Sequence, residues 1–313
     1  MDNMKHKPIQ VTPHLFQLGT RSFPVYLSMG EEGMIIEGGT GATFDIITSQ
    51  IESLGIDPMK IKTIVLTHTH PDHIGAVPRF RQIWKHVKVL AGPVAGKNLK
   101  RENFVKEFLP ADRMIGKVCI ESGDIKDLPP LLEEYRFEAD AVIGENDRID
   151  LGGGVVWRVF ETPGHSPCHI SLHEEKERTM VLGDITGYYE PKRDAFWPNY
   201  FHSLEDYCGS IRRMMAIPSK RALLSHNGVI EGDVTGYLEK ALMATEAYHH
   251  ELMNKLNRGE QTEEICREKA DWVWDLGPLA SYKAIAFLCG LLLKNSMKEN
   301  VKNRFTPSQA EAA

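Results

Sequence analysis

The stretch Thr63-Ile64-Val65-Leu66-Thr67-His68-Thr69-His70-Pro71-Asp72-His73 guides the interpretation of the whole 313-residue chain. Its first four residues form a continuous apolar run, which is typical of a strand buried in a sheet. His68 and His70 alternate along an extended segment, so their imidazoles project to the same side. Asp72 and His73 open the next expected helix, where they can face a second ion. A chance match to this HxHxDH pattern is expected only about 0.001 times in a chain of this composition.

The composition excludes several classes of protein. Hydrophobic residues make up 42% of the chain and charged residues 26%, so a disordered or collagen-like chain is excluded. The net charge of −6 argues against a dedicated nucleic-acid binder, which needs a basic face. The sequence contains no apolar run of about 18 residues, so we expect no transmembrane helix. The first residues are polar, so we expect no signal peptide there. The five cysteines are scattered, which suits reduced thiols, and we expect a cytoplasmic protein.

The pattern of apolar residues predicts an α/β fold followed by helices. Strand-like runs dominate the first 70 residues, and strands then alternate with helical spacing as far as residue 91. Residues 97–140 read as an insertion with some helix. After Gly232 the pattern becomes helical, with expected helices at 237–256, 260–270 and 279–293. We therefore expect a catalytic domain at residues 1–230 and a helical cap or extension at residues 231–313.

Three more candidate ligands, His165, Asp184 and His226, each follow an expected strand. Alone, each would be an ordinary turn or surface residue, but ligand sites gather at strand ends in layered α/β folds. With the HxHxDH run they make seven potential ligands, enough for two divalent metal ions. Imidazole and carboxylate ligands suit zinc, which we favour, and also iron or manganese. We expect the other histidines mainly at the surface: His6, His14, His86, His173, His249 and His250.

These motifs together resemble the metallo-β-lactamase superfamily over residues of about 10 to 230. The shared features are the Glu37-Gly38-Gly39 turn, the HxHxDH run and the later PGH, GD and His motifs. The resemblance implies an αββα sandwich with a C-terminal helical extension and a dinuclear site. By this analogy one metal binds His68, His70 and His165, and the other binds Asp72, His73 and His226, with Asp184 bridging. Glu37 and His169 would support these ligands.

The closest branch of this superfamily, by resemblance, holds acyl-CoA thioesterases, such as those for 2-aminobenzoylacetyl-CoA, and glyoxalase II-type enzymes. The resemblance implies a thioesterase that uses metal-bound hydroxide, with Asp72 or Asp184 steadying the nucleophile. A lactonase or other ester hydrolase is the main alternative, followed by a phosphodiesterase and a regulatory protein that retains its metals. Asp184 argues against a true β-lactamase, and His70 argues against a diiron redox enzyme.

The expected substrate is a small thioester or ester, and its pocket is the least defined part of the prediction. Six aromatic residues lie within residues 188–201 and suggest an apolar wall, although they could equally fix a loop onto the core. The helices after residue 231 could form a lid or the interface of a homodimer. We expect neither a nucleic-acid nor a membrane partner. The candidate substrate residues are Tyr188, Tyr189, Arg193, Phe196, Trp197, His202 and Ser281.

Overall fold

The computed structural model describes residues 6–277 and 279–298, which pack as two compact units. Unit 1 contains residues 6–161, 168–183 and 222–229. Unit 2 contains residues 162–167, 184–221 and the described part of 230–298. The units interleave along the chain, so they differ from the predicted domains at 1–230 and 231–313, and that division stays a prediction.

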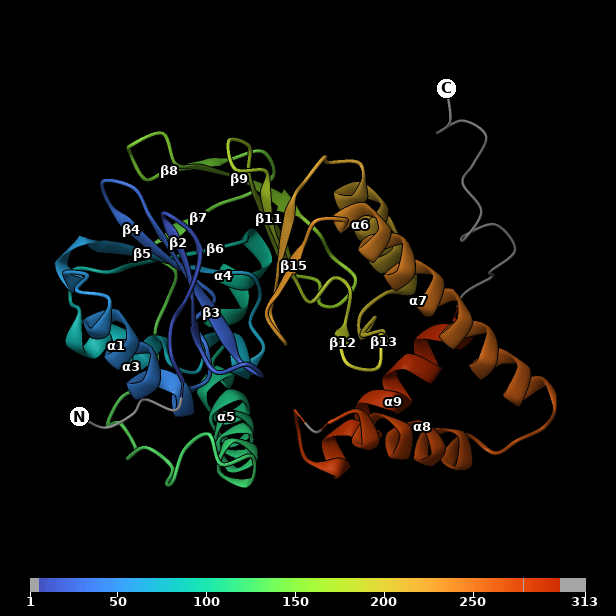
Figure 1. Cartoon of the computed structure of the whole chain (residues 1–313). Helices are drawn as coiled ribbons and strands as arrows, with labels where there is room; N and C mark the ends of the chain where they lie inside the picture. The colour runs from blue at the N-terminus through green and yellow to red at the C-terminus, as the bar shows by residue number, and fades with distance from the viewer. Residues whose placement is uncertain (1–5, 278, 299–313) are drawn as a thin grey trace. The chain divides into compact units, whose positions relative to one another are not determined.

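Unit 1 contains a seven-stranded sheet whose strands follow the chain order. The strands up to β4 pair antiparallel, and the later ones pair parallel across helical crossovers. The sheet runs from dark blue to green in Figure 1. Its strands are β1 (Ile9–Thr12), β2 (Leu15–Gly19), β3 (Pro24–Met29), β4 (Gly33–Ile36), β5 (Ile61–Leu66), β6 (Lys88–Ala91) and β7 (Ala141–Val142).

A six-stranded sheet has the order β15-β14-β11-β10-β9-β8. Side chains of both sheets form one buried cluster that includes Tyr26, Val65, Trp157 and Leu172. Successive side chains of a strand point to opposite faces of the sheet. Val65 therefore belongs to this cluster, while its neighbours Ile64 and Leu66 belong to another cluster on the other face. The strands are β8 (Arg148–Asp150), β9 (Val156–Glu161), β10 (Ile170–Glu174), β11 (Thr179–Gly183), β14 (Arg221–Leu224) and β15 (Val229–Glu231).

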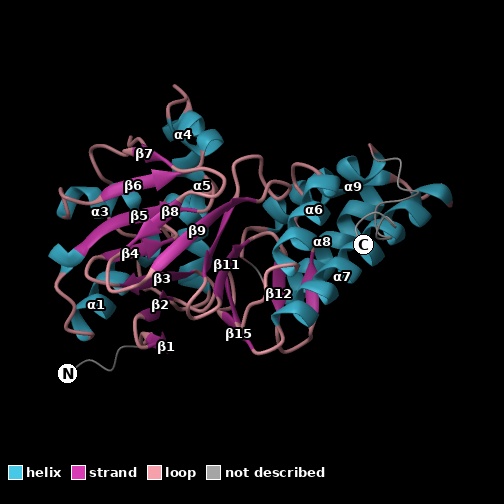
Figure 2. Ribbon diagram, turned by 90° about the horizontal axis from the view of Figure 1, so that it is seen from above, coloured by secondary structure: helices cyan, strands magenta, loops and turns pink. Residues whose placement is uncertain are grey.

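Helices of unit 1 pack against the side of the first sheet that carries Ile64 and Leu66 (Figure 2). This arrangement explains why β5 is apolar along its whole length, since both of its faces are covered. The α/β fold class is confirmed. The helices are α1 (Phe44–Ser53), α2 (Pro71–Ile74), α3 (Val77–Ile83), α4 (Pro93–Leu99) and α5 (Phe104–Glu121), with the 3₁₀ turns η1 (Gly41–Thr43) and η2 (Pro58–Lys60).

Helix α5 lies in the stretch that the sequence predicted as an insertion, and Asp112 fixes it to the sheet domain. The buried Asp112 carboxylate accepts hydrogen bonds from Thr40 Oγ1 at 2.7 Å and from the Gly41 amide at 2.8 Å. A Cβ atom on Gly75 would lie 2.1 Å from Asp112 Oδ1. Burial raises the pKa of Asp112. This carboxylate therefore packs tightly against the turn before α1 and the end of α2.

Unit 2 contains a β-hairpin followed by helices. These helices confirm the predicted helical C-terminal region. Side-chain caps begin several helices; Ser203 Oγ, for example, accepts from the Asp206 amide at 3.1 Å. None of the helices among residues 6–277 and 279–298 is long and apolar enough to cross a membrane. The elements are β12 (Tyr188–Glu190), β13 (Ala195–Trp197), α6 (Leu204–Met215), α7 (Val234–Asn257), α8 (Thr262–Leu276) and α9 (Tyr282–Met297).

Candidate metal centre

The HxHxDH run lies where β5 ends and α2 begins. Pro71 occupies the first turn of α2, where its missing amide hydrogen is not needed, and so it starts the helix directly after His70. His68 Nε2 and His70 Nδ1 lie 3.0 Å apart. The rings of His68 and His73 have their centroids 4.1 Å apart. The strand end and the short helix thus gather three imidazoles of unit 1.

Asp72, His73 and His226 form the second ligand group of unit 1. Their candidate ligand atoms all lie within 4.8 Å of one another. Asp72 Oδ2 is 3.2 Å from His73 Nε2 and 3.5 Å from His226 Nε2. Although 153 residues separate His73 from His226 in the chain, the ends of β5 and β14 bring them together. This group agrees with the set predicted for one metal.

The buried carboxylate of Glu37 holds this group in place. Glu37 Oε2 is 2.9 Å from His73 Nδ1, and Oε1 accepts hydrogen bonds from Thr67 Oγ1 at 2.8 Å and Ser225 Oγ at 2.9 Å. The backbone of Glu37 has a φ of 75°, an uncommon left-handed conformation for a residue with a side chain. A carboxylate on Nδ1 fixes the imidazole so that Nε2 is presented to a metal.

His226 is fixed from the backbone. Its Nδ1 donates to the carbonyl of Ser22 at 2.7 Å. Asn227 follows in the left-handed conformation with a φ of 63°, which asparagine tolerates. The ring of His169, the predicted support, is buried with its centroid 5.2 Å from that of His68. A Cβ atom on Gly183 would lie 2.3 Å from His169 Nε2, so the glycine makes room for this ring.

Unit 2 carries the remaining predicted ligands, His165 and Asp184. Both side chains are buried, and His165 Nε2 lies 3.5 Å from Asp184 Oδ2. His165 Nδ1 lies 3.0 Å from the carbonyl oxygen of Asn199, to which it can donate. His165 thus repeats the arrangement of His73 in unit 1: its Nδ1 faces an oxygen acceptor, and its Nε2 faces another candidate ligand.

The spacing of these donor atoms fits a metal site. Ligand atoms around one tetrahedral zinc, each about 2.0–2.1 Å from the ion, lie about 3.3 Å apart. The distances of 3.0, 3.2 and 3.5 Å among the unit 1 donors scatter around that value, as does the 3.5 Å pair in unit 2. The donors are imidazole nitrogens and carboxylate oxygens, the set that zinc, iron and manganese accept. The residues present therefore fit divalent metal ions.

The predicted substrate residues lie mainly on or near the β12–β13 hairpin. Phe196 and Trp197 are buried. The ring centroid of Tyr189 lies 4.5 Å from that of Phe196 and, in an edge-to-face arrangement, 5.2 Å from that of Tyr237. Burial and the hydrogen bond from Tyr189 to Asp194 at 2.9 Å raise the pKa of Tyr189 to about 12. These aromatic side chains do fix the hairpin, which was the alternative to an apolar substrate wall.

The other predicted substrate residues have varied surroundings, and contact between this set and a substrate stays a prediction. Arg193 and His202 are exposed. Ser281 caps α9 by accepting from the Ala284 amide at 3.3 Å. The hydroxyl of Tyr188 lies 3.5 Å from Glu190 Oε2, and a Cβ atom on Gly277 would be 3.4 Å from it.

Sequence reasoning named Glu37 as a support but missed the other groups that hold the ligands. Thr67 and Ser225 each directly precede a ligand histidine, and this shared position was a usable signal. The carbonyls of Ser22 and Asn199 left no signal, because any residue supplies a carbonyl. The surface placement of His173 and His249 was wrong, since both are buried. His173 lies within β10 and His249 within α7, where packing covers them.

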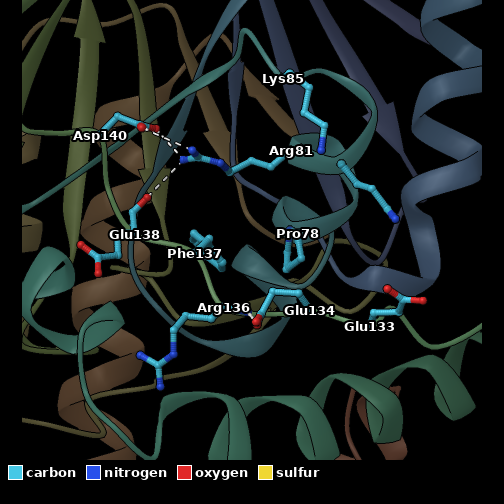
Figure 3. Close-up of a pocket in the computed structure, with 10 residues that line it drawn as sticks. Pro78, Arg81, Lys85, Glu133, Glu134, Arg136, Phe137, Glu138 and Asp140 are labelled. Carbon is cyan, nitrogen blue, oxygen red and sulfur yellow. Dashed lines mark hydrogen bonds and ion pairs between the residues drawn. The ribbon is translucent and has the colours of Figure 1, made fainter.

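One hollow in unit 1 is lined by none of the predicted ligands. It has a volume of about 490 Å³ and a mixed-charge lining (Figure 3). Arg81 pairs with Asp140 at 2.6 Å across one side of it. Its lining consists of Pro78, Arg81, Gln82, Lys85, Glu133, Glu134, Arg136, Phe137, Glu138 and Asp140. The lining carries three basic side chains, Arg81, Lys85 and Arg136, and four acidic ones, so both signs of charge border the hollow.

Comparisons with known proteins support the same family. Residues 25–226 match the model of the metallo-β-lactamase superfamily. The metallo-β-lactamase fold-containing protein ST1585 of Sulfurisphaera tokodaii is 27% identical over 68% of this chain and 76% of its own length. Its solved structure has a TM-score of 0.55 at 24% identity, covering 76% of this chain and 86% of that one.

Two further relatives carry activity names. The N-acyl homoserine lactonase AttM of Azorhizobium caulinodans is 33% identical over 55% of this chain. The hydroxyacylglutathione hydrolase GloC of Haemophilus influenzae is 26% identical over 46% of it. The matches span only 59% and 58% of the length of these two relatives. The family model covers well over half of the sequence and includes all seven candidate ligands, and the chain belongs to the metallo-β-lactamase superfamily.

Proposed function

We propose that the unit 1 ligands act with His165 and Asp184 as one dinuclear metal centre, and that this centre hydrolyses a small thioester. One observation carries the proposal. In both units an imidazole Nδ1 lies against an oxygen acceptor, at 2.9 Å for His73 and 3.0 Å for His165, while its Nε2 faces a candidate carboxylate ligand. Such prearranged imidazoles are the usual mark of metal ligands.

The two carboxylates differ in access to solvent, which suggests different tasks. Bound divalent metals would supply Lewis acidity and lower the pKa of a coordinated water. The side chain of Asp72 is 19% exposed, whereas that of Asp184 is 4% exposed. Asp72 can therefore accept a proton from an attacking water at its carboxylate. The more deeply buried Asp184 suits the bridging role that the family pattern implies.

The thioester is favoured over the lactone because its leaving group departs more easily and because the hydroxyl of Tyr189 is already engaged. A thiolate leaves without strong help from an acid, whereas a ring-opening alkoxide needs a proton or an electrophile. Tyr189 is the obvious candidate donor, but its hydroxyl donates to Asp194 at 2.9 Å and has its pKa raised to about 12. The name of the relative GloC, a hydroxyacylglutathione hydrolase, fits this choice.

A lactonase is the second candidate, since the relative named as an N-acyl homoserine lactonase shares 33% identity. The net charge of −6 makes a phosphodiesterase for nucleic acids less attractive. We further propose zinc as the resident metal, a cytoplasmic location, a small-molecule substrate without nucleic-acid or membrane partners, and a homodimer as one assembly for the helical extension.

The deciding experiment compares two substrate panels on one preparation. Protein purified without added metal is first analysed for its metal content and then loaded with zinc. Thiol release from short, long and aromatic acyl-CoAs is compared with ring opening of N-acyl homoserine lactones, with chelated protein as the matched control. We expect metal-dependent thiol release. Ready lactone hydrolysis with no thiol release would reject the thioesterase in favour of the lactonase, and no turnover of either panel would reject both.

A further inference from the structure

Asn295, near the end of α9, makes an unusual pair of hydrogen bonds to the segment after β13. Its Nδ2 donates to the carbonyl oxygens of Tyr200 and Phe201, both at 2.9 Å. Its Oδ1 accepts from Lys298 Nζ at 3.0 Å, which fits this orientation of the amide. The side chain is 5% exposed. One amide nitrogen thus uses both of its hydrogens on two successive carbonyls.

The segment that Asn295 holds is the one that contacts His165. The carbonyl of Asn199, directly before Tyr200, lies 3.0 Å from His165 Nδ1. The Gly164 carbonyl accepts from the amides of His202 and Ser203 at 3.0 and 3.1 Å, and the Phe201 ring centroid is 5.3 Å from that of His165. The segment therefore borders His165 on two sides.

Local secondary structure does not fix this segment. Residues 198–202 lie between β13 and α6 and belong to neither a helix nor a strand. The Asn199 carbonyl accepts one local hydrogen bond, from the Phe201 amide at 2.8 Å, so its direction follows the position of the peptides that come after it. Asn295 binds the two peptides that follow Asn199. From the other side, Tyr207 Oη accepts from the Asn199 amide at 3.3 Å.

We propose that Asn295 is a positioning residue for the His165 imidazole, acting through the Asn199 carbonyl. The inference rests on the proposed metal role of His165. Holding Tyr200 and Phe201 aims the Asn199 oxygen at Nδ1, which keeps the proton on Nδ1 and the lone pair of Nε2 toward the metal. The helical extension thereby contributes to metal binding without supplying a ligand.

A matched control is available one residue further along. Ser296 is equally buried, and its Oγ contacts the hydroxyl of Tyr200 at 2.8 Å rather than a backbone carbonyl. Ser296→Ala therefore loosens the packing of α9 on the same residue but leaves the two carbonyl contacts intact. Asn295→Asp keeps the shape of the side chain, removes the donor and places a carboxylate oxygen against the two carbonyls.

The test measures metal binding and the state of His165 in the full-length protein. We expect Asn295→Asp to weaken zinc binding about 10- to 100-fold, as removing a group that orients a ligand usually does, and to change the visible spectrum of the cobalt-loaded protein. Ser296→Ala should leave both within about twofold of the wild type, even though its melting temperature falls. Equal effects of the two substitutions, or no effect of Asn295→Asp, would overturn the proposal.

A second measurement keeps the proposal independent of the metal and of catalysis. In chelated protein, the Nδ1 proton of His165 is identified by its loss from the nitrogen-edited spectrum of His165→Gln. We expect Asn295→Asp to speed its exchange with water at least tenfold, whereas Ser296→Ala leaves the exchange rate unchanged. If Asn295→Asp does not fold, Asn295→Ala, which removes the donor without adding a charge, serves instead and should speed exchange in the same direction. An unchanged rate would refute the positioning role, whereas a protein that binds no metal would refute the proposed function alone.

Discussion

His73 of unit 1 and His165 of unit 2, both candidate metal ligands, are supported in different ways. In unit 1, His73 is held by the Glu37 carboxylate, which also accepts hydrogen bonds from Thr67 and Ser225. In unit 2, His165 faces a backbone carbonyl in a segment without secondary structure, and a distant helix holds that segment. A charged, side-chain support is strong and local, whereas a backbone support depends on the packing of the chain around it.

This difference shows where each support is vulnerable. The unit 1 support can be removed by one substitution next to a motif. The unit 2 support has no side chain of its own to remove, so it can be reached only through residues such as Asn295 and Tyr207. We therefore expect direct ligand changes to have the largest effects, followed by loss of the Glu37 carboxylate.

The largest effect should come from Asp184→Ala. Loss of a carboxylate that would hold both metals removes several kcal/mol of transition-state stabilisation, and about 4 kcal/mol corresponds to a roughly 10³-fold fall in kcat/KM. Thiol release measures it, together with metal content by elemental analysis. Retention of near-normal turnover would remove the unit 2 ligands from the centre. Unchanged function in the cell despite lost turnover would favour a regulatory protein.

Glu37→Gln tests the unit 1 support. Glutamine keeps the size of the side chain, but its amide group cannot accept from Thr67, Ser225 and His73 as a carboxylate does. We expect zinc affinity and kcat/KM to fall about 10- to 100-fold. Glu37→Asp, which keeps the charge, is the control, and its zinc affinity and kcat/KM should fall less. If Gln and Asp behave alike, the charge of Glu37 has no part in the difference between the two supports.

His173→Leu sharpens the comparison with a histidine that is buried outside the metal centre. Burial lowers the pKa of His173, and Arg158 lowers it further against the opposing effect of Glu175. A lowered pKa favours the neutral form in the folded state. The resulting stability is present above the unfolded-state pKa of about 6.5 and is lost as the pH falls through the folded-state pKa.

Chemical unfolding of metal-free protein at pH 7 and pH 5 measures this effect. Between these two pH values, we expect the wild type to lose more unfolding free energy than His173→Leu does. Arg158→Leu controls for the nearby charge and should reduce the acid-induced loss only partly. Identical pH dependence in the wild type and His173→Leu would show that His173 does not gain a proton on unfolding.

The smallest effect should follow Tyr189→Phe. The Tyr189 hydroxyl donates to Asp194, which also pairs with Lys240 at 2.6 Å on an exposed surface. Exposed contacts of this kind contribute little, so we expect thioester and lactone turnover to stay within about twofold. A selective loss of lactone hydrolysis would place this hydroxyl at the substrate carbonyl and would favour the lactonase over the thioesterase.

The motif-bearing part of the centre was predictable because its residues repeat a pattern dictated by chemistry. His68 and His70 alternate along an extended segment, so their spacing indicates a common direction, and Asp72 and His73 open the next helix, where they can face a second ion. The predicted α/β class and C-terminal helices followed from apolar periodicity, and the helix predicted at 237–256 lies within α7. His165 and Asp184 became candidates only together with that motif.

What could not be predicted depends on backbone atoms and on long-range packing. Nothing in the sequence links Asn295 to Tyr200, because the contact spans 95 residues and ends on a carbonyl. The burial of His173 was missed because polar residues follow it in the sequence, and such a composition is typical of a strand that faces solvent. The aromatic residues of the β12–β13 hairpin were ambiguous, since packing and substrate binding demand the same composition.

Asp112 has a consequence for how this protein can change over evolutionary time. Its carboxylate leaves no room for a side chain at Gly75 and little at Gly41, where a Cβ atom would lie 2.6 Å from Oδ2. The inserted helix and the ligand-bearing segment are thus fitted to each other through three mutually dependent positions. Loss of the helix would remove the Asp112 contact at both glycines, but a Cβ atom on Gly75 would still lie 2.6 Å from the Gly41 backbone nitrogen. Gly75 is therefore constrained with or without the helix, whereas the constraint on Gly41 comes mainly from Asp112.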